Sequence, residues 1–569
     1  MELTKEQKII IDELVKNKNG KYAIEACAGS GKTFTIFQAI EHIKQVEPNA
    51  KILYIVFNKA NQLSAESKLK AYDFTTNPVK VRTCNAYGYE KWLKTIGKFE
   101  VVSTFDKQTI YDFQQKCPKY DVKYSKHRPF KMLLEKYDTS KLTLNSFCDD
   151  MIAHWDDDYD GIDKPKDCEI IDKKGNPIIK YGIPCDKYSV ITKDHIPVFK
   201  KMVEYYIENK KYTHGMYMKS AAYSNSEKTM GDEWDYVFFD EAQDANYFVL
   251  KLLSKQNIRK IYFVGDTRQS IYNFGGINEN VFEQYKFKKK YTLSTSFRFG
   301  QAISDVANII LNGDGLHITG TEQDDIPTDI TKCTRLYRTN AKLFKDALSL
   351  AYKALSKDVR LKLDFMRTEQ ETKLNDDMFA FISLFYKYTD GEAYEKSKRY
   401  LQIAETSELM KTFEKRLMET KNFYRAYNEM YDFLSDDIHS MFTYVKEDNN
   451  FIMKLSALED CKYCLNPQYV ITLVTMHRSK GLEWDNVIIA EPTKLFYTTK
   501  DSDMPHKNPD FMQELNLGYV AVTRSRKTLN AEVLLSEIED FGIDLQNNTF
   551  RVKDGKALTW EYLKKLKSK

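Results

Sequence analysis

The chain has 569 residues, with 86 Lys plus Arg against 82 Asp plus Glu and a formal net charge of +4 at pH 7. This length exceeds what one compact core can organise, and it predicts roughly three or four domains of about 100 to 200 residues each. Because the charges nearly balance, the composition excludes a chain that is basic throughout, so nucleic-acid binding would have to rely on local groups.

The nine cysteines are an odd number spread over the whole chain, which argues against a secreted disulfide framework. Cys461 and Cys464 form one Cys-x-x-Cys pair, which could be half of a zinc or iron–sulfur site. We favour free thiols, because no second pair stands at matching spacing. No stretch approaches the roughly 18 apolar residues of a membrane span and the first residues lack an apolar signal core. We expect a cytoplasmic protein, or a nuclear one if the host is eukaryotic.

Residues 4–15 are predicted to form an amphipathic helix with Thr4 as N-cap and Gln7 at the capping-box position. Gln7 therefore has two candidate roles, the cap and a pair of hydrogen bonds to an adenine edge. One side chain can hardly combine both.

Residues 26–33 read ACAGSGKT and lie between an apolar run at 22–24 and a helix-like stretch at 34–43. A phosphate-binding loop requires glycines that let backbone N–H groups turn inward, a lysine for the phosphates and a hydroxyl for Mg²⁺. Gly29, Gly31, Lys32 and Thr33 supply these groups, although Ala26 replaces the usual first glycine.

Strand-like runs and helical stretches then alternate, which predicts a parallel sheet. Residues 51–57 (KILYIVF) precede a helical stretch at 61–69, and residues 79–83 begin a third unit. Residues 94–211 break this pattern with polar helices, an acidic run at 156–158 and a hairpin signal at 172–177, and we interpret them as an inserted subdomain.

The strand pattern returns at 236–239, which runs into Asp240 and Glu241, and at 260–264. Carboxylates at the C-terminal ends of parallel strands lie where open α/β sheets bind ligands. In a nucleoside triphosphatase one carboxylate holds Mg²⁺ and the other orients and deprotonates the attacking water. Arg298 and Arg524 are candidates for the positive charge that phosphoryl transfer also requires.

A second α/β half is predicted to start near Tyr291. Its strands are expected at 335–338, 469–474 and 486–490. Residues 351–467 read as a long amphipathic helical stretch with little strand signal, which indicates a second insertion.

Together these stretches resemble the superfamily 1 DNA helicases of the UvrD/Rep type. The motifs that carry the resemblance occur in order as ACAGSGKT (26–33), ILYIVFNKA (52–60), RTCNAYGY (82–89), DEAQD (240–244), GDTRQSIYNFGG (265–276), TSFRFG (295–300), TMHRSKGLEW (475–484) and NLGYVAVTRSR (516–526). The sequences of these motifs are most similar to those of the F-box DNA helicase branch, although no F-box is evident. The resemblance covers the two motor domains well and the insertions poorly.

The resemblance implies an α/β fold with two RecA-like parallel-sheet motor domains, 1A and 2A, each interrupted by a mainly helical inserted subdomain, 1B or 2B. The expected boundaries are 1–93 (1A, first part), 94–211 (1B), 212–288 (1A, second part), 289–350 (2A, first part), 351–467 (2B) and 468–569 (2A, second part, with a C-terminal tail).

The resemblance also assigns roles at the nucleotide. Lys32 would bind phosphates, Glu241 would be the general base, Gln269 would sense the γ-phosphate, and Arg298 and Arg524 would be arginine fingers. The implied ATP-binding set is Gln7, Ala28, Gly29, Ser30, Gly31, Lys32, Thr33, Phe297 (stacked on adenine), Arg298, Gly481, Glu483 (at the ribose) and Arg524. The implied Mg²⁺ ligands are Thr33 and Asp240.

For single-stranded DNA the resemblance implies aromatic platforms beside polar groups for the backbone. The stacking positions are Phe57, Tyr272 and Phe274, and the other DNA-binding positions are Asn58, Thr83, Asn85 and His477. Three positions depart from the family. Asn85 stands where His is frequent, Gly275 where Arg is frequent, and Phe34 follows the phosphate loop where Arg is common.

We therefore expect an ATP-dependent single-stranded DNA translocase and DNA helicase that uses ATP and Mg²⁺, acting in repair, recombination or replication. Residues 480–483 (KGLE) resemble the 3′-to-5′ branch. The expected partners are single-stranded DNA, single/double-strand junctions and proteins at the insertions, with no membrane. The alternatives are a motor subunit of a repair or defence complex that unwinds little alone, and a non-catalytic scaffold, against which Lys32 and Glu241 argue.

Overall fold

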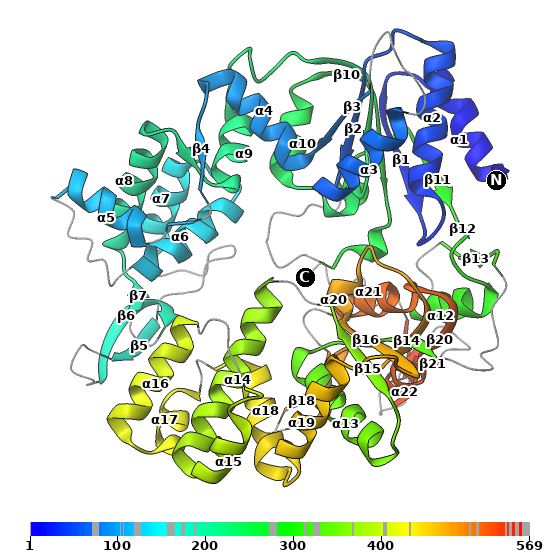
Figure 1. Cartoon of the computed structure of the whole chain (residues 1–569). Helices are drawn as coiled ribbons and strands as arrows, with labels where there is room; N and C mark the ends of the chain where they lie inside the picture. The colour runs from blue at the N-terminus through cyan, green and yellow to red at the C-terminus, as the bar shows by residue number, and fades with distance from the viewer. Residues whose placement is uncertain are drawn as a thin grey trace. The chain divides into compact units, whose positions relative to one another are not determined.

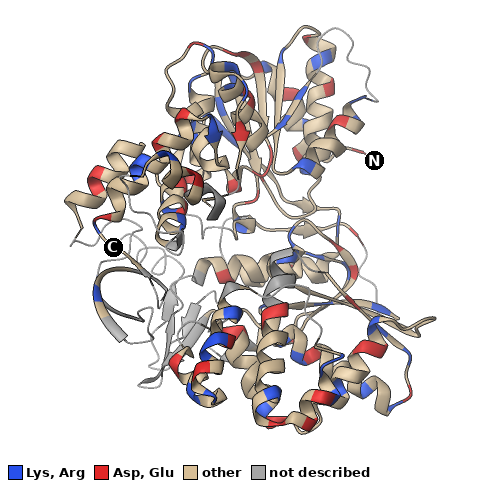
Figure 2. Cartoon of the chain, turned by 60° about the vertical axis from the view of Figure 1, so that its left-hand side comes forward, with Lys and Arg blue, Asp and Glu red and all other residues tan. Residues whose placement is uncertain are grey.

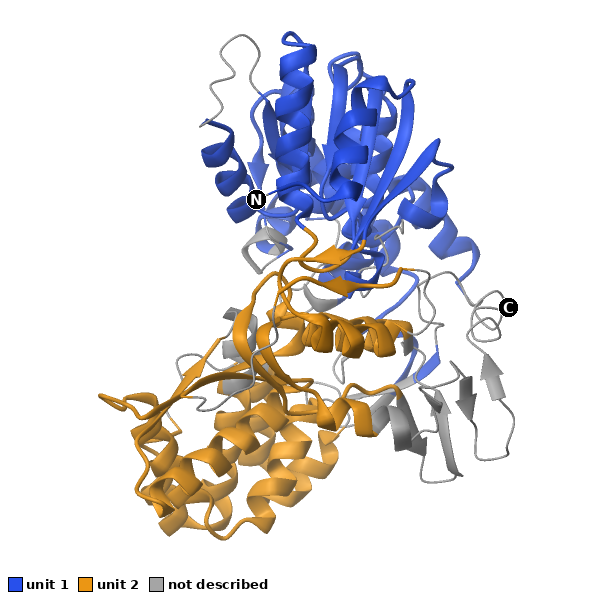
Figure 3. Cartoon of the chain, turned by 90° about the vertical axis from the view of Figure 1, so that its right-hand side faces the viewer, with its two compact units in different colours: residues 1–26, 31–293 blue, residues 27–30, 294–569 orange. Residues whose placement is uncertain are grey.

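The computed structural model divides into two compact units, unit 1 (residues 1–26 and 31–293) and unit 2 (residues 27–30 and 294–569), which Figure 3 colours separately. The residues that the structure describes are 2–70, 79–102, 104–105, 107–118, 127–155, 166–171, 177–186, 189–271, 281–311, 316–322, 331–366, 369–401, 407–431, 434–499, 502–507, 511–540, 543–544, 549–551 and 557–559.

Unit 1 is built on a six-stranded sheet in the order β11-β1-β10-β9-β2-β3, in which every neighbouring pair is parallel (Figure 1). The strands are β1 (Gly20–Ala26), β2 (Ile52–Val56), β3 (Lys80–Thr83), β9 (Glu233–Phe239), β10 (Asn257–Gly265) and β11 (Lys289–Leu293). All five residues of β2 are buried, as expected for a strand that is covered on both faces.

Helices cover both faces of this sheet. Alternate strand residues such as Tyr22 and Tyr54 join one core with α1 and α2, while Ala23, Leu53 and Ile55 join another. The helices before the insertion are α1 (Lys5–Lys16), α2 (Lys32–Val46), α3 (Lys59–Lys70) and α4 (Cys84–Ile96). Thr4 caps α1 and forms a complete capping box with Gln7, which confirms the predicted start of this helix.

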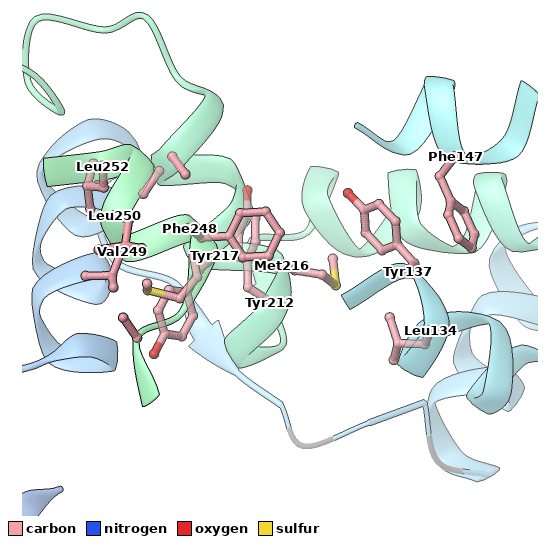
Figure 4. Close-up of a cluster of buried hydrophobic side chains, with 14 of the residues drawn as sticks. Leu134, Tyr137, Phe147, Tyr212, Met216, Tyr217, Phe248, Val249, Leu250 and Leu252 are labelled. Atoms are coloured by element: carbon pink, nitrogen blue, oxygen red, sulfur yellow. The ribbon is translucent and has the colours of Figure 1, made fainter. Parts of the chain in front are cut away.

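The segment between β3 and β9 adds a mainly helical body. Its elements are β4 (Glu100–Val101), α5 (Lys107–Lys116), α6 (His127–Thr139), α7 (Leu144–Ala153), β5 (Lys166–Ile171), β6 (Pro177–Asp186), β7 (Ser189–Ile191), α8 (His195–Glu208), β8 (Lys211–Tyr212) and α9 (His214–Tyr223). Antiparallel pairing of Ile171 with Pro177 confirms the hairpin. The acidic run at 156–158 lies outside the described residues. Figure 4 shows α6, α7, α9 and α10 (Tyr247–Ser254) contributing to one apolar cluster.

Unit 2 contains a five-stranded sheet in the order β15-β16-β14-β17-β20, again with parallel neighbours throughout. The strands are β14 (Lys332–Tyr337), β15 (Leu361–Phe365), β16 (Tyr469–Thr475), β17 (Trp484–Ile489) and β20 (Ser525–Asn530). The two parallel sheets confirm the predicted α/β class.

A helical core joins the sheet of unit 2 to the segment between β15 and β16. Its helices are α13 (Asn340–Ser356), α14 (Glu369–Thr389), α15 (Gly391–Ser397), α16 (Glu408–Thr420), α17 (Phe423–Glu429), α18 (Asp436–Glu447) and α19 (Phe451–Lys462). The remaining elements are α11 (Val281–Gln284), β12 (Thr295–Ser296), α12 (Gln301–Leu311), β13 (Thr319–Gly320), α20 (Met476–Ser479), β18 (Phe496–Thr499), β19 (Ser502–Lys507), α21 (Phe511–Val522), α22 (Glu532–Asp540), β21 (Ile543–Asp544), β22 (Thr549–Arg551) and β23 (Ala557–Thr559).

Two details of the expected organisation need correction. The strand around Tyr291, expected to open the second half, is β11, and it pairs with β1 in the first sheet, so the division falls after Leu293 and not after residue 288. Residues 351–467 were expected to be helical, yet β15 pairs with β16 at the edge of the second sheet. Both strands have only five residues, two of them charged, so their local patterns are weak and their pairing partners decide their place in the sheets.

Residues of both charge signs occur in both units. Figure 2 shows Lys and Arg interspersed with Asp and Glu over both units. Among the described residues, no helix is both long and apolar enough to cross a membrane.

Candidate nucleotide site

The phosphate-loop backbone turns at two glycines in the left-handed region, Gly29 (φ +76°) and Gly31 (φ +74°). A Cβ on Gly29 would lie 2.6 Å from both Arg298 Cβ and Ser296 Oγ, so only glycine fits there. Gly31 is the N-cap of α2 and provides no side-chain cap. Ser30 is buried, and its Oγ has no hydrogen-bond partner among the described residues. A helix N-terminus with an unpartnered buried hydroxyl fits phosphate oxygens.

Residues 27–30 of the loop group with unit 2 and are held there through their backbone. Ser296 Oγ donates to the Ala28 carbonyl at 2.8 Å, and the Phe297 N–H donates to the Gly29 carbonyl at 2.9 Å. The Ala28 N–H donates to the Tyr519 hydroxyl at 3.1 Å. Ser296 and Tyr519 were not among the predicted site residues, although both stand in the motifs quoted for the resemblance.

The carboxylate pair lies at the C-terminal end of β9. Asp240 Oδ1 accepts a hydrogen bond from the Glu241 N–H at 3.0 Å, and Oδ2 accepts one from the Tyr54 hydroxyl at 2.8 Å. Burial, assisted by the negative charge of Glu241, raises the pKa of Asp240 to about 6. Burial and the Asp240 carboxylate also raise the pKa of Tyr54 well above its usual value. Tyr54 is a site residue that the sequence analysis missed.

Glu241 has a positive φ of +52°, which is unusual for a residue with a long side chain. Its Oε1 lies 3.8 Å from Lys32 Nζ, and its Oε2 accepts a hydrogen bond from Gln243 Nε2. The structure therefore brings together the predicted residues Lys32, Asp240 and Glu241. A turn of strained backbone immediately after a buried strand is typical of a functional position.

A second buried network follows β10. Asp266 is fully buried and accepts hydrogen bonds from Arg268 Nε at 2.8 Å and Gln269 Nε2 at 2.9 Å. Its N–H donates to Gln243 Oε1 at 3.1 Å, so a chain of hydrogen bonds runs from Glu241 to Gln269. Burial alone would raise the pKa of Asp266, but Arg268 and Lys32 hold it below its usual value. Asp266 and Gln243 were not predicted as site residues.

Gln7 makes the capping-box contacts in this structure. Its Oε1 accepts from the Thr4 N–H at 3.0 Å, and its Nε2 donates to Thr35 Oγ1 at 3.0 Å. Its side chain is buried against α2. The contact to adenine stays a prediction.

The predicted arginines lie in unit 2 with the predicted ribose contact. Arg298 Nε lies 2.7 Å from Glu483 Oε2, and Arg298 NH1 donates to the Thr523 carbonyl at 2.9 Å. Arg524 is 1% exposed and donates to the Val520 carbonyl at 2.8 Å and the Leu482 carbonyl at 3.2 Å. Burial opposes ionisation of Glu483, but Arg298 and Arg526 keep its pKa below the usual value. Gly481, three residues before β17, has φ +83°.

Comparison with protein families decides the class of this chain. The model of the UvrD-like helicase C-terminal domain matches residues 120–533, which is more than half of the sequence. The chain belongs to the UvrD-like helicase family. A second model, of the type III restriction enzyme res subunit, matches residues 1–112. The predicted superfamily 1 class of enzyme is thereby confirmed.

Curated relatives of this UvrD-like helicase include F-box DNA helicase protein 1 of Schizosaccharomyces pombe, 26% identical over 93% of this chain and 57% of the relative. F-box DNA helicase 1 of Gallus gallus is 28% identical over 52% of this chain and 29% of the relative. ATP-dependent DNA helicase PcrA of Leuconostoc citreum is 25% identical over 29% of this chain and 26% of the relative. The chain thus spans about half of the yeast relative and less of the others.

Several predicted DNA contacts of this helicase lie at the C-terminal ends of two adjacent strands, β2 and β3. Phe57 is 44% exposed just after β2, and Asn58 follows it and accepts a hydrogen bond from the Asn61 N–H at 2.8 Å. Thr83 caps α4, and Asn85 is exposed in its first turn. The structure therefore gathers four of these residues at one edge of the sheet of unit 1.

The other predicted DNA contacts are not brought into this group. His477 lies in unit 2, half-buried on α20. Tyr272 and Phe274 lie outside the described residues, as does Gly275. Phe34 is 36% exposed. Cys461 is buried in the helical core of unit 2, and both it and Cys464 are free.

Proposed function

We propose that this UvrD-like helicase hydrolyses ATP to move along single-stranded DNA in the 3′-to-5′ direction and to separate duplexes. The observation that carries this proposal is the arrangement after β9, where Lys32, Asp240 and Glu241 gather beside the phosphate loop. An ammonium, a buried carboxylate and a partly exposed carboxylate are the groups that phosphoryl transfer to water requires.

In this proposal the chain's own residues share the work at the triphosphate. Lys32, the Ser30 hydroxyl and the N–H groups at the start of α2 bind phosphate oxygens. Glu241 takes the proton of the attacking water, and Gln269 senses the γ-phosphate. Arg298 and Arg524 neutralise the charge that accumulates on the phosphates in the transition state.

Thr33 and Asp240 are proposed to hold Mg²⁺. The donor set fits, because a hydroxyl and a carboxylate are the oxygen ligands that this small, hard cation prefers alongside water and phosphate oxygens. When bound, the ion neutralises charge on the β- and γ-phosphates.

Single-stranded DNA is the proposed track. Phe57 offers an exposed ring at the edge where Asn58, Thr83 and Asn85 offer polar groups, a combination that suits stacked bases beside a sugar–phosphate backbone. The names of the relatives, which include DNA helicases, support DNA as substrate. The sequence KGLE at residues 480–483 supports movement in the 3′-to-5′ direction.

The division into 1A, 1B, 2A and 2B is retained as part of the proposal, with the boundary between the halves moved to Leu293. Contacts of 1B and 2B with proteins, preference for single/double-strand junctions, a cytoplasmic or nuclear location and a role in repair, recombination or replication belong to the same proposal. The alternative is a DNA-stimulated motor subunit that unwinds little alone.

The deciding experiment measures ATP-dependent strand separation on matched duplexes that carry either a 3′ or a 5′ single-stranded tail. We expect separation only from the 3′ tail, and its loss in Glu241→Gln and Lys32→Ala. Separation only from the 5′ tail would contradict the polarity. DNA-stimulated ATP hydrolysis without separation of either substrate would favour the motor-subunit alternative.

A further inference from the structure

Tyr54 stands in a row of aromatic residues that crosses four strands of the first sheet. Strand register aligns Tyr54 with Phe238, Phe238 with Tyr262, and Tyr262 with Tyr22. Phe238 and Tyr262 stack at 5.5 Å between ring centroids, as do Tyr262 and Tyr22 at 5.0 Å. All four side chains are buried, so the row packs one face of the sheet.

The hydroxyl groups in this row point to different partners. Tyr22 donates to the carbonyl of Lys18, just after α1, and Tyr262 donates to the carbonyl of Leu14, in the last turn of α1. Tyr54 instead donates to Asp240 Oδ2 at 2.8 Å. Of these three phenols, only that of Tyr54 meets the nucleotide site.

A backbone hydrogen bond and a ring contact hold Tyr54 in place beside Asp240. The Asp240 N–H donates to the Ile55 carbonyl at 2.9 Å, which ties the residue after Tyr54 to the residue after β9. Phe37 of α2 packs edge-on against the Tyr54 ring, with centroids 6.1 Å apart and planes at 81°. Because the ring is 1% exposed and packed against Phe37, its hydroxyl has little freedom to turn away from Asp240.

We propose that Tyr54 is a positioning residue that orients Asp240, one of the two proposed Mg²⁺ ligands, through its phenol hydroxyl. With the Glu241 N–H on Oδ1 and the phenol on Oδ2, both carboxylate oxygens of Asp240 are held, and each keeps a lone pair for a ligand. Groups that hydrogen-bond a metal ligand set its orientation, and their loss typically lowers metal affinity by about 10- to 100-fold. This inference rests on the proposed function.

A packing role alone would not need the oxygen. Phenylalanine would fill the same space in the row, as Phe238 does on the neighbouring strand. A buried hydroxyl without a hydrogen-bond partner lowers the stability of the fold. The presence of a hydroxyl at this position therefore indicates that its hydrogen bond to Asp240 has a role.

The test compares Tyr54→Phe with Tyr262→Phe, a matched control that removes a buried phenol oxygen from the same row. Two quantities are measured on the full chain, the Mg²⁺ concentration that gives half-maximal ATP hydrolysis and the Mg²⁺-dependent gain in affinity for a fluorescent ATP analogue. We expect Tyr54→Phe to raise the Mg²⁺ midpoint by about tenfold or more, with kcat at saturating Mg²⁺ nearly unchanged, and to reduce the gain in affinity. Tyr262→Phe should lower only the thermal midpoint.

Equal Mg²⁺ midpoints and equal affinity gains in wild type and Tyr54→Phe would overturn the proposal. If Tyr54→Phe does not fold, Tyr54→Met, which also removes the phenol, is measured in the same way, and a Mg²⁺ midpoint equal to wild type would have the same meaning. A wild-type chain that hydrolyses no ATP would contradict the proposed function, whereas analogue binding would still test Tyr54.

Discussion

At the scale of single residues, the phosphate loop depends on a position that tolerates no side chain. Gly29 combines a left-handed φ of +76° with two contacts that an added Cβ would make at 2.6 Å. One contact is with the Cβ of Arg298, which cannot move without its backbone. Alanine at this position would therefore strain the loop and displace its neighbours at once.

We expect Gly29→Ala to weaken binding of a fluorescent ATP analogue by at least about tenfold, equivalent to about 1.4 kcal/mol. Gly391→Ala is the control, because Gly391 begins α15 with nothing within 4 Å of an added Cβ. Alanine there should leave nucleotide binding unchanged. Wild-type affinity in Gly29→Ala would show that the loop can relax around a methyl group.

At the scale of elements, a buried lysine joins α9 to α6. Lys219 is 2% exposed, donates to the Tyr137 carbonyl, and lies 3.6 Å from the centroid of the Tyr137 ring. The ring belongs to the apolar cluster of Figure 4. Burial lowers the pKa of Lys219 to about 7, although the charge of Asp138 opposes the shift. The ammonium is thus held in an environment that favours its neutral form.

This pKa predicts a pH-dependent stability of unit 1. Between pH 7 and 9 the unfolded chain keeps a proton on this lysine that the folded chain tends to lose, so the free energy of unfolding rises with pH. We expect Lys219→Met to remove up to about 1 kcal/mol per pH unit from that slope. Calorimetry of the full chain at several pH values measures how the free energy of unfolding changes with pH. Lys98→Met, at an exposed position, should keep the wild-type slope, and an unchanged slope in Lys219→Met would contradict the pKa.

At the scale of the whole molecule, the chain has two units with cores of their own. Within unit 2, Arg338 after β14 and Glu514 on α21 form a two-pronged ion pair, with Arg338 NH2 and Nε at 2.6 and 2.9 Å from the two Glu514 oxygens. The Glu514 side chain is 4% exposed. Removing one partner of such a pair leaves the other charge without compensation.

We expect Glu514→Ala to lower the free energy of unfolding of unit 2 by about 3 kcal/mol and to leave that of unit 1 unchanged. Scanning calorimetry of the full chain, in which multidomain proteins commonly show separate transitions, follows both units. Glu392→Ala is the control, because the ion pair of Glu392 with Lys396 on α15 is exposed and should contribute little to the free energy of unfolding. A single transition that shifts as a whole in Glu514→Ala would show that the units unfold as one.

Much of the fold was predictable, because it depends on local patterns. Strands such as β2, β9 and β16 are apolar runs bounded by polar residues, and the cap of α1 is a short-range signal. β11 and β15 were misplaced or missed, because each is only five residues long and two of the five are charged. Their assignment depends on β1 and β16, which lie far away in the sequence.

The sequence by itself determined the family and the residue types at the proposed nucleotide site, because the phosphate loop and the motif around Asp240 are each contiguous and chemically constrained. Only the tertiary structure decided which residues from other segments support them. Tyr54 and Asp240 are 186 positions apart and meet because β2 and β9 pair in parallel. Such partners depend on strand register, which is set by the packing of the whole sheet and leaves no mark in the local sequence.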